Sequence, residues 1–417
     1  MALDNAKYKP GSDISEPARQ RQSKSMVIHV VALSLTKTAD GLVDPKLTLT
    51  WLLGALGAPA AMVAWLVPIR ESLSLLPQMF VASRMRKHAI RKTFWSAGSL
   101  LQGLAVLAMG IVALSCKGIL AGGLILALLA LFSLARGVCS VAIKDVQGKT
   151  IAKSRRGKVS GLAASVGGVS LLVFGAALSL GLLDNAEQQL LGTLLIAGAG
   201  LWLLAAAIYQ QLPELEGDVE SGAQEHVDIR HAFRAALKMG KFRRFLLTRA
   251  LLLSSALMTP FLVSLSFQSP HQLRTLGALL LASGLAGFIS GPIWGHLADK
   301  SSRTVLYLAP LITAATGLGA WWFGVASSLG FALLIFTTNL AHAGIRLGRK
   351  TYVIDMANQH NRAVLVSLSN TLIGMMLLLA GAFSALLASI IDTRWLVLGL
   401  SLIALLAAWS AWTMEEA

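Results

Sequence analysis

The chain has 417 residues, of which 55% are hydrophobic and only 13% are charged, and its formal net charge is +16. A soluble domain carries about 25% charged residues, so this composition excludes an ordinary soluble protein. Apolar runs of about 20 residues, the length that a helix needs to cross the hydrocarbon of a bilayer, recur along the chain. The sequence therefore predicts an all-α integral membrane protein.

The predicted elements begin after a polar, mixed-charge segment at 1–26. This segment contains no apolar stretch before a small-residue cleavage site, so it is expected to be a cytosolic tail and not a signal peptide. Twelve transmembrane helices are predicted at about 27–55, 59–83, 93–115, 119–142, 159–182, 190–210, 244–268, 274–297, 304–325, 329–347, 364–390 and 394–413.

The one long connection, 211–243, separates six spans from six. It begins acidic and is expected to be disordered, and from about Asp228 it becomes a basic amphipathic helix that suits the inner leaflet. The predicted parts are a tail at 1–26, an N-terminal six-helix bundle at 27–210, this cytosolic loop, a C-terminal six-helix bundle at 244–413 and a tail at 414–417.

The two halves resemble each other. The shift that superposes Lys144 on Lys350 also superposes Arg156 on Arg362, and each arginine stands just before the next span. Weak internal symmetry of this kind is typical of transporter folds built from repeats.

The positively charged residues are distributed unevenly between the two sides of the membrane. Most Lys and Arg residues fall in the N-terminal tail and in the loops on its side of the membrane, and few fall in the opposite loops. This asymmetry places both termini in the cytoplasm. It also explains the net charge without a nucleic-acid partner. Very short outer loops and the absence of an N-x-[ST] sequon are compatible with a bacterial inner membrane.

The cysteines give no sign of a disulfide or a metal site. Cys116 and Cys139 fall near opposite faces of the membrane, too far apart for a disulfide. Neither belongs to a metal-ligand spacing. No metal and no cofactor is therefore expected.

A short motif stands at the inner end of the eighth span, in GPIWGHLADKSSRTVL at 291–306. It resembles the signature loop of the major facilitator superfamily, G-x-L-a-D-R-x-G-R-R. The matching residues are Gly295, Leu297, Ala298, Asp299 and Arg303, while Lys300 replaces an arginine and Ser302 a glycine.

The resemblance implies two pseudo-symmetric six-helix bundles and a cytoplasmic gate. A glycine lets two helices approach, and a carboxylate at a helix end pairs with cations of a neighbouring helix. In the family this aspartate holds the cytoplasmic side closed in the outward-open state, a role that Asp299 would inherit. The predicted gate consists of Gly295, Asp299, Lys300, Arg303, Arg86, Arg156 and Arg362.

Two departures leave the subfamily unassigned. The corresponding loop of the first half, 82–92, has Arg86 where the family has its aspartate, so the second half alone carries the latch or the halves pair differently. The fifth span has glycines but lacks the proline of the drug–proton antiporter pattern.

Charged residues also occur inside the spans. Lys37, Asp40 and Asp44 are spaced i, i+3 and i+7, so they share one face of the first span. Lys37 lies about 15 Å deep, near the midplane. Pro45 is expected to break this helix and free backbone carbonyls to line a cavity.

An ionised residue at the centre of a span costs roughly 2.5–3.5 kcal/mol, so these charges require partners or a water-filled cavity. One interpretation is a structural ion pair, such as Asp44 with Arg70, and snorkelling suits Lys46 and Arg136 near the span ends. The other is function, because a buried carboxylate beside arginines can exchange a proton for a salt bridge. The predicted substrate and proton-coupling residues are Lys37, Asp40, Asp44, Arg70, Glu71 and Arg249.

Other polar residues are weaker candidates. Asn339, His342 and Asn370 could contact substrate, although polar residues in spans more often join helices. The basic run 344–350 is expected to anchor the tenth span at the inner face.

These features favour a secondary active transporter that works as a monomer in the cell inner membrane. A surplus of buried cations suits a small organic, anionic solute. Proton coupling is expected and sodium is left open, while the absence of a G-x-x-x-x-G-K-[ST] loop gives no support for direct ATP drive. The alternative is a transporter-like receptor or assembly partner without transport. An enzyme is not expected, because the histidines are scattered and no catalytic pair is present.

Overall fold

The computed structural model describes residues 14–182, 187–217, 238–268, 272–324, 327–356 and 362–416. Apart from one short 3₁₀ turn, η1 (Ser266–Gln268), the regular structure of these residues is α-helical. The helices are α1 (Glu16–Leu42), α2 (Thr48–Ala55), α3 (Ala60–Leu75), α4 (Gln78–Arg86), α5 (Lys92–Ser115), α6 (Gly118–Thr150), α7 (Lys153–Ser179), α8 (Glu187–Gln210), α10 (Gly240–Leu251), α11 (Leu253–Leu265), α12 (Gln272–Lys300), α13 (Ser302–Phe323), α14 (Ser328–Met356), α15 (Arg362–Ala388) and α16 (Thr393–Trp412).

Eleven stretches of the described residues are long and apolar enough to cross a membrane. They correspond to the second to twelfth predicted spans, with α3 and α4 joined as one span and α10 and α11 as another. The first predicted span is formed by α1 and α2 and is not among these eleven stretches of the described residues. All-α architecture with serial apolar spans is thus confirmed.

The first span is interrupted where the sequence predicts a break. α1 ends at Leu42 and α2 begins at Thr48, with Pro45 between them. A proline lacks the N–H that would continue the helical ladder. The carbonyl of Pro45 instead accepts a hydrogen bond of 3.0 Å from the hydroxyl of Thr50.

Two further spans are interrupted. The second is divided at Pro77, which precedes α4, whereas Pro68 lies inside α3. The seventh is divided at Leu252, whereas Pro260 lies inside α11. Pro77 is tolerated at the start of α4 because its missing N–H would have no intrahelical partner there.

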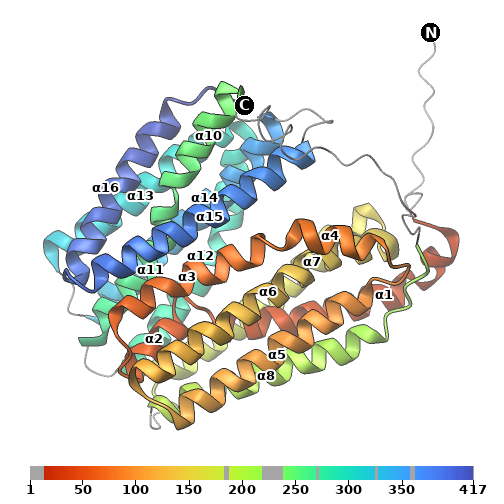
Figure 1. Cartoon of the computed structure of the whole chain (residues 1–417), viewed down its shortest axis with the longest axis horizontal. Coiled ribbons are helices and arrows are strands. Elements are labelled where there is room, and N and C mark those ends of the chain that lie inside the picture. Colours follow the sequence, from red (N-terminus) through yellow and green to blue (C-terminus); the bar gives the residue numbers. More distant parts are fainter. Residues whose placement is uncertain are drawn as a thin grey trace.

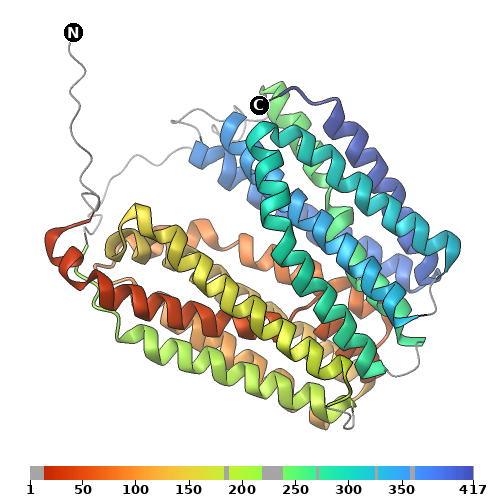
Figure 2. The same ribbon diagram turned by 180° about the vertical axis from the view of Figure 1, so that it is seen from behind.

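The helices form two groups that meet at one end and diverge at the other (Figures 1 and 2). The start of α1 and the end of α16 lie on the side where the groups diverge, which we call the terminal face, and the opposite side is the far face. α3 packs on α15, and α7 packs on α12, so two seams join the halves.

Glycines allow close approach along the α7–α12 seam near the far face. A Cβ placed on Gly175 would lie 3.0 Å from the backbone nitrogen of Leu281, and one on Gly277 would lie 2.5 Å from that of Ser179. Any side chain at Gly277 would therefore force the two helices apart.

The same two helices are separated toward the terminal face. Space is open within 4 Å around the Cβ positions of Gly157 and Gly161 in α7 and of Gly287, Gly291 and Gly295 in α12. Within the described residues, these three glycines of α12 thus make no close contact with another helix.

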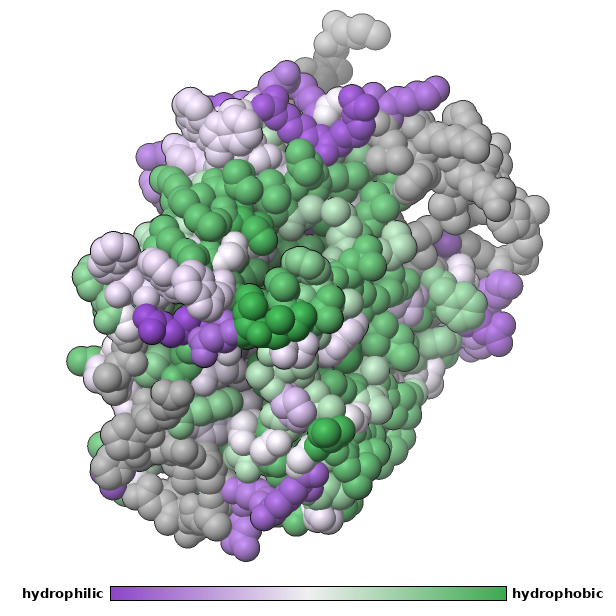
Figure 3. All heavy atoms as spheres, turned by 60° about the vertical axis from the view of Figure 1, so that its left-hand side comes forward, coloured by the Kyte–Doolittle hydropathy of each residue, from purple (hydrophilic) through white to green (hydrophobic). Residues whose placement is uncertain are grey.

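Apolar side chains dominate the surface between hydrophilic rims (Figure 3). Large exposed residues include Phe288, Trp322, Phe323 and Leu329, which are 73–84% exposed. An exposed apolar surface of this extent suits lipid contact and not water.

The beginning of the central connection does not follow the expectation of disorder. Leu212 is fully buried and Glu214 is 8% exposed, so residues 212–217 pack against the first half. The amphipathic helix predicted from about Asp228 begins within 218–237, outside the described residues.

Candidate functional site

Asp40 stands at the centre of an ion cluster contributed by three helices. Its carboxylate, on α1, pairs directly with Arg136 of α6. A second guanidinium, that of Arg70 on α3, lies 3.8 Å away. The guanidinium carbon of Arg70 lies 5.1 Å from the centre of the Phe132 ring, within cation–π distance. Arg136 is therefore a partner of Asp40, although its position suggested snorkelling.

Asp44 has a different structural task. Its carboxylate accepts hydrogen bonds from the backbone N–H groups of Lys46 at 2.8 Å and Leu47 at 3.0 Å. These bonds satisfy N–H donors of the turn that follows Pro45, directly before α2. Arg70 pairs with Asp40, so the suggested Asp44–Arg70 pair is replaced.

Glu71 faces cations from both halves. The cations that attract its carboxylate are Lys46, Arg70, Arg349 and Arg346. No ion pair of Glu71 is formed within the described ranges, so these cations surround the carboxylate at longer distances.

The two arginines of α14 extend the site into the second half. Arg346 is exposed and Arg349 is half-buried, and both act electrostatically on Glu71 of the first half. From the sequence, the run 344–350 is expected only to anchor the tenth span at the inner face. The signal was available, because positions 342, 346 and 349 share one helical face.

Arg249 serves the second half. Its guanidinium donates to the hydroxyl of Ser369 and, at 2.9 Å, to the amide oxygen of Asn370. It thereby joins α10 to α15. His342 and Ser255 join α14 to α11 with a contact of 3.1 Å.

Asn339 forms a similar contact, because its amide donates to Ser283 at 3.0 Å. Within the described residues, the three polar candidates Asn339, His342 and Asn370 thus join helices, as polar residues of membrane spans commonly do.

Lys37 is exposed, although it lies at the depth of the ion cluster. It lines a cavity of about 430 Å³ within the first half, together with Asp40 and Arg136. Lys37 therefore belongs to the same region as Asp40, Arg70 and Arg136, while Arg249 lies in the other half.

The predicted gate residues of the second half that the structure describes, Gly295, Asp299, Lys300 and Arg303, do not pair with one another. Asp299, at the end of α12, has no ion-pair partner among the residues that the structure describes. Arg303 instead contacts the end of the chain, with its guanidinium 3.0 Å from the carbonyl oxygen of Met414 and 2.8 Å from the carboxylate of Glu416. Lys300 closes α12 beside Asp299.

The chain end is held by two further contacts. Lys241 forms an ion pair of 2.7 Å with Glu415, and the hydroxyl of Tyr352 donates to the Glu415 carbonyl at 2.8 Å. The hydrogen bond from Lys241 holds the pKa of the Glu415 carboxyl below its usual range.

The two predicted gate residues of the first half, Arg156 and Arg86, lie on different helices. Arg156 donates to the carbonyls of Ile151 at 2.8 Å and Gly148 at 3.0 Å, at the end of α6. Arg86 is exposed at the end of α4. The side chain of Arg362 lies outside the described part of the structure.

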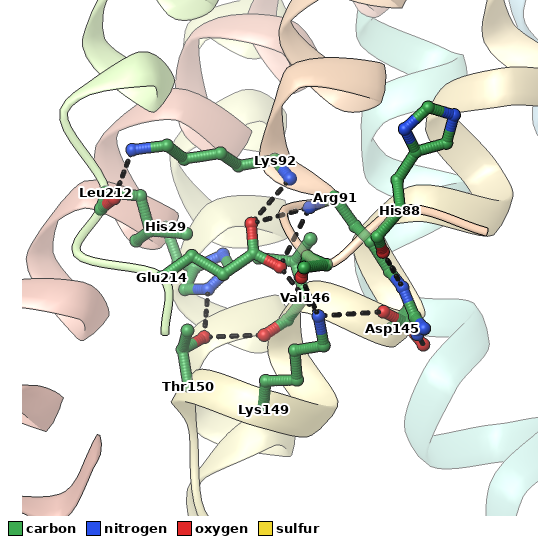
Figure 4. Close-up of polar contacts among 11 residues, drawn as sticks. His29, His88, Arg91, Lys92, Asp145, Val146, Lys149, Thr150, Leu212 and Glu214 are labelled. Atoms are coloured by element: carbon green, nitrogen blue, oxygen red, sulfur yellow. Dashed lines mark hydrogen bonds and ion pairs between the residues drawn. The ribbon is translucent and has the colours of Figure 1, made fainter. Parts of the chain in front are cut away.

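Glu214, a buried carboxylate that is not among the predicted site residues, binds the loop before α5 (Figure 4). Glu214 accepts hydrogen bonds from the backbone N–H groups of Arg91 at 2.9 Å and Lys92 at 2.6 Å, and Lys149 lies 3.1 Å away. Arg91 in turn pairs with Asp145 at 2.7 Å. The basic loop 82–92 thus receives carboxylates from α6 and from the central connection. The acidic residues directly after the sixth span were a signal for this contact.

No family model and no curated protein sequence matches the chain. Solved structures do match. A mutant form of the nucleoside transporter NupG has a TM-score of 0.75 at 14% identity, over 94% of this chain and 99% of that one. The xylose transporter XylE from E. coli, in an inward open conformation, has a TM-score of 0.68 at 9% identity, over 95% and 96%. A POT family transporter has a TM-score of 0.69 at 10% identity, over 93% and 95%. The chain has the major facilitator fold.

In this major facilitator fold, the ion cluster lies in the first half and the α14 arginines in the second. A bacterial homologue of the lysosomal transporter Spinster, described as inward-facing and unoccupied, has a TM-score of 0.59 at 14% identity, over 95% and 97% of the two chains. The matched structures are transporters, and the resemblance that the motif at 291–306 indicated is confirmed at the level of the fold.

Proposed function

We propose that this protein is a secondary active transporter that moves a small organic, anionic solute across the cell inner membrane by alternating access. The observation that carries the proposal is the ion cluster of Asp40, Arg70 and Arg136 beside a broken first span, in a fold whose halves diverge at one face. In membrane proteins, charges at this depth mark substrate and ion pathways.

The terminal face is assigned to the cytoplasm by the positive-inside rule, and the state is therefore inward-open. Open space around the terminal-side glycines of α7 and α12 supports this assignment. The unpaired Asp299 fits a latch that forms only when the cytoplasmic side closes. The protein is expected to act as a monomer, with the bilayer and the solute as its partners.

The balance of charges supports an anionic solute. Around the broken first span, four cations (Lys37, Lys46, Arg70 and Arg136) stand against three carboxylates (Asp40, Asp44 and Glu71), and Arg346 and Arg349 add positive charge from the second half. An anionic group can pair with such cations and offset part of the cost of keeping them out of water.

Proton coupling follows from competition for the arginines. A carboxylate at Asp40 holds Arg136 and Arg70, whereas a protonated Asp40 would release both to an anionic solute. Binding of a proton and of the solute would then favour each other. Sodium is the alternative coupling ion, and transport that requires sodium but no pH gradient would establish it.

The test is charge movement and isotope flux in proteoliposomes, challenged with pooled anionic metabolites across a pH gradient. Wild type is compared with Asp40→Asn and with Asp392→Asn as the matched control, because Asp392 is exposed and only caps α16 through Arg394. We expect proton-driven flux in wild type and the control, and at least a hundredfold loss in Asp40→Asn with normal membrane insertion. Coupled flux at the wild-type rate in Asp40→Asn would contradict the coupling role.

Absence of flux in wild type, together with a stable protein partner on purification, would favour the receptor alternative.

A further inference from the structure

Six cations and three carboxylates gather where the broken first span faces the second half. Their charges act on one another around Asp40 and around Glu71. The cations are Lys37, Lys46, Arg70, Arg136, Arg346 and Arg349, and the carboxylates are Asp40, Asp44 and Glu71. Three positive charges of this group therefore have no negative counterpart within it.

Four of these cations make no direct polar contact. Arg70 and Arg136 share the carboxylate of Asp40. The other four, which we call the interfacial cations, form no ion pair and no side-chain hydrogen bond within the described residues; they are Lys37, Lys46, Arg346 and Arg349. Lys37 of the first half and Arg346 of the second are exposed, so a solute can reach cations of both halves.

α3 brings Glu71 next to the second half, where it packs on α15 (Figure 1). A Cβ on Gly381 of α15 would collide with the ring of Pro68, and a Cβ on Gly374 would lie 3.6 Å from the carbonyl oxygen of Ser72. Glu71 lies between these two contact points along α3. The seam between α3 and α15 therefore runs beside the charged group.

Arg346 and Arg349 of α14 face the first half. Both attract the carboxylate of Glu71, and the charge of Arg346 also acts on Lys37 and Lys46. The two arginines are one helical turn apart, so their guanidinium groups can serve the same ligand. The interfacial cations thus form one set that spans the two halves.

The surplus of positive charge matters when the halves close around a solute. Water that solvates the cations in an open site is then excluded, and buried charges without partners are strongly unfavourable. A solute with one negative charge offsets one of the surplus charges, whereas a solute with two negative charges offsets two. Each proton taken up by a carboxylate of the group enlarges the surplus, so proton uptake favours a dianion further.

The position of the interfacial cations on opposite halves also bears on closure. A ligand shifts a conformational equilibrium only by its differential affinity for the two states. A solute with one anionic group at each half binds most strongly when the halves approach. Its binding therefore favours the closed, loaded state through which alternating access passes.

We propose that the solute carries two separate anionic groups, as in a small dicarboxylate, with one group held by each half. Lys37 and Lys46 hold one carboxylate, and Arg346 and Arg349 hold the other. Glu71 is the counterion of these cations in the unloaded site, and the solute displaces it. This inference rests on the proposed transport function and specifies its substrate class.

Binding to the purified full chain in detergent is measured by thermal unfolding at neutral pH and constant ionic strength, since a ligand of the folded state raises Tm with its concentration. The probes are succinate and glutarate, their half-amides succinamate and glutaramate, and inorganic phosphate. Each half-amide has nearly the size of its diacid but one charge less, and phosphate carries its charges in a single group. We expect succinate or glutarate to stabilise the protein, with its half-amide and phosphate binding about tenfold more weakly or worse.

Substitutions of the α14 arginines test how the second carboxylate is held. Arg346→Gln and Arg349→Gln should each weaken binding of the dicarboxylate about tenfold or more and reduce its preference over the half-amide. Arg346→Lys keeps the charge and should keep the preference, which also covers the case in which Arg346→Gln fails to fold. Glu71→Gln removes the competing carboxylate and should tighten binding of the dicarboxylate about threefold or more.

Lys117→Gln is the matched control. Lys117 is an exposed cation directly before α6, tied through its neighbour Gly118 to the end of α2 and not part of the charged group. This variant loses the same charge as the arginine variants and should bind every probe as wild type does.

The outcomes separate this inference from the transport proposal. Equal binding of a diacid and its half-amide, phosphate binding as tight as that of the diacids, an unchanged preference in both arginine variants, or no stabilisation by any probe overturns the inference. Proton-driven flux of a monoanion, unaffected by Arg346→Gln and Arg349→Gln, overturns the inference but keeps the transport function. Selective binding of a dicarboxylate without flux in proteoliposomes keeps the site and overturns the transport function.

Discussion

At the scale of single residues, identical side-chain types have different tasks because of what surrounds them. Asp40 and Asp44 are four positions apart, yet Asp40 pairs with Arg136 and Asp44 binds the backbone of the turn between α1 and α2. Glu214 lies in an acidic, loop-like stretch and is nevertheless buried under basic residues. Spacing along the chain predicted the shared face of α1 but not this division of roles.

Glu214 is expected to matter for stability. Glu214→Gln removes the charge that Lys149 and two backbone N–H groups satisfy, and charge-assisted hydrogen bonds contribute about 1.5–3 kcal/mol each. We expect a loss of about 2–4 kcal/mol in the free energy of unfolding, measured as a lower Tm in detergent. Glu216→Gln, two residues along the chain and exposed, is the control and should leave Tm unchanged. An equal Tm for both variants would show that the buried contacts are energetically unimportant.

At the scale of helices, three predicted spans are each divided into two. Prolines explain two of the breaks, after α1 and after α3, but Pro68 and Pro260 lie inside helices. Pro68 serves packing instead, because its ring lies where a side chain on Gly381 of α15 would have to stand. A proline in the sequence therefore marks a candidate break, and tertiary contacts decide whether the break occurs.

The hydrogen bonds of Asp44 in the turn before α2 give a prediction that separates structure from coupling. Asp44→Asn keeps an oxygen that can accept the N–H groups of Lys46 and Leu47, whereas Asp44→Ala removes it. We expect Asp44→Ala to lower the free energy of unfolding by about 1 kcal/mol and Asp44→Asn to preserve both stability and proton-driven flux. Loss of coupling in a stable Asp44→Asn variant would return Asp44 to the coupling residues.

At the scale of the whole molecule, the α7–α12 seam joins the halves near the far face, and its two helices separate toward the terminal face. Alternating access requires the opposite arrangement as well, with the terminal ends of α7 and α12 together and Asp299 paired. The open space at Gly161 and Gly287 leaves room for spin labels that report this closure.

Labels at Gly161→Cys and Gly287→Cys, in a Cys116→Ser, Cys139→Ala background, should give two distance populations by pulsed electron paramagnetic resonance. The shorter distance corresponds to the closed terminal face. Asp299→Asn removes a charged latch contact worth about 1.5–3 kcal/mol, so the short population should fall about tenfold or more. Asp392→Asn is the control. Unchanged populations in Asp299→Asn would mean that this aspartate does not hold the closed state.

The sequence by itself determined the membrane class, the serial apolar spans, the side that carries the positive loops and, through the motif at 291–306, the fold. These properties are local, because hydropathy and loop charge depend on neighbouring residues. Only the tertiary structure decided that Arg136 holds Asp40 across 96 positions and that Glu214 reaches Arg91 across 123. Partners so distant in the chain are chosen by helix packing, and the pattern within one span does not contain that information.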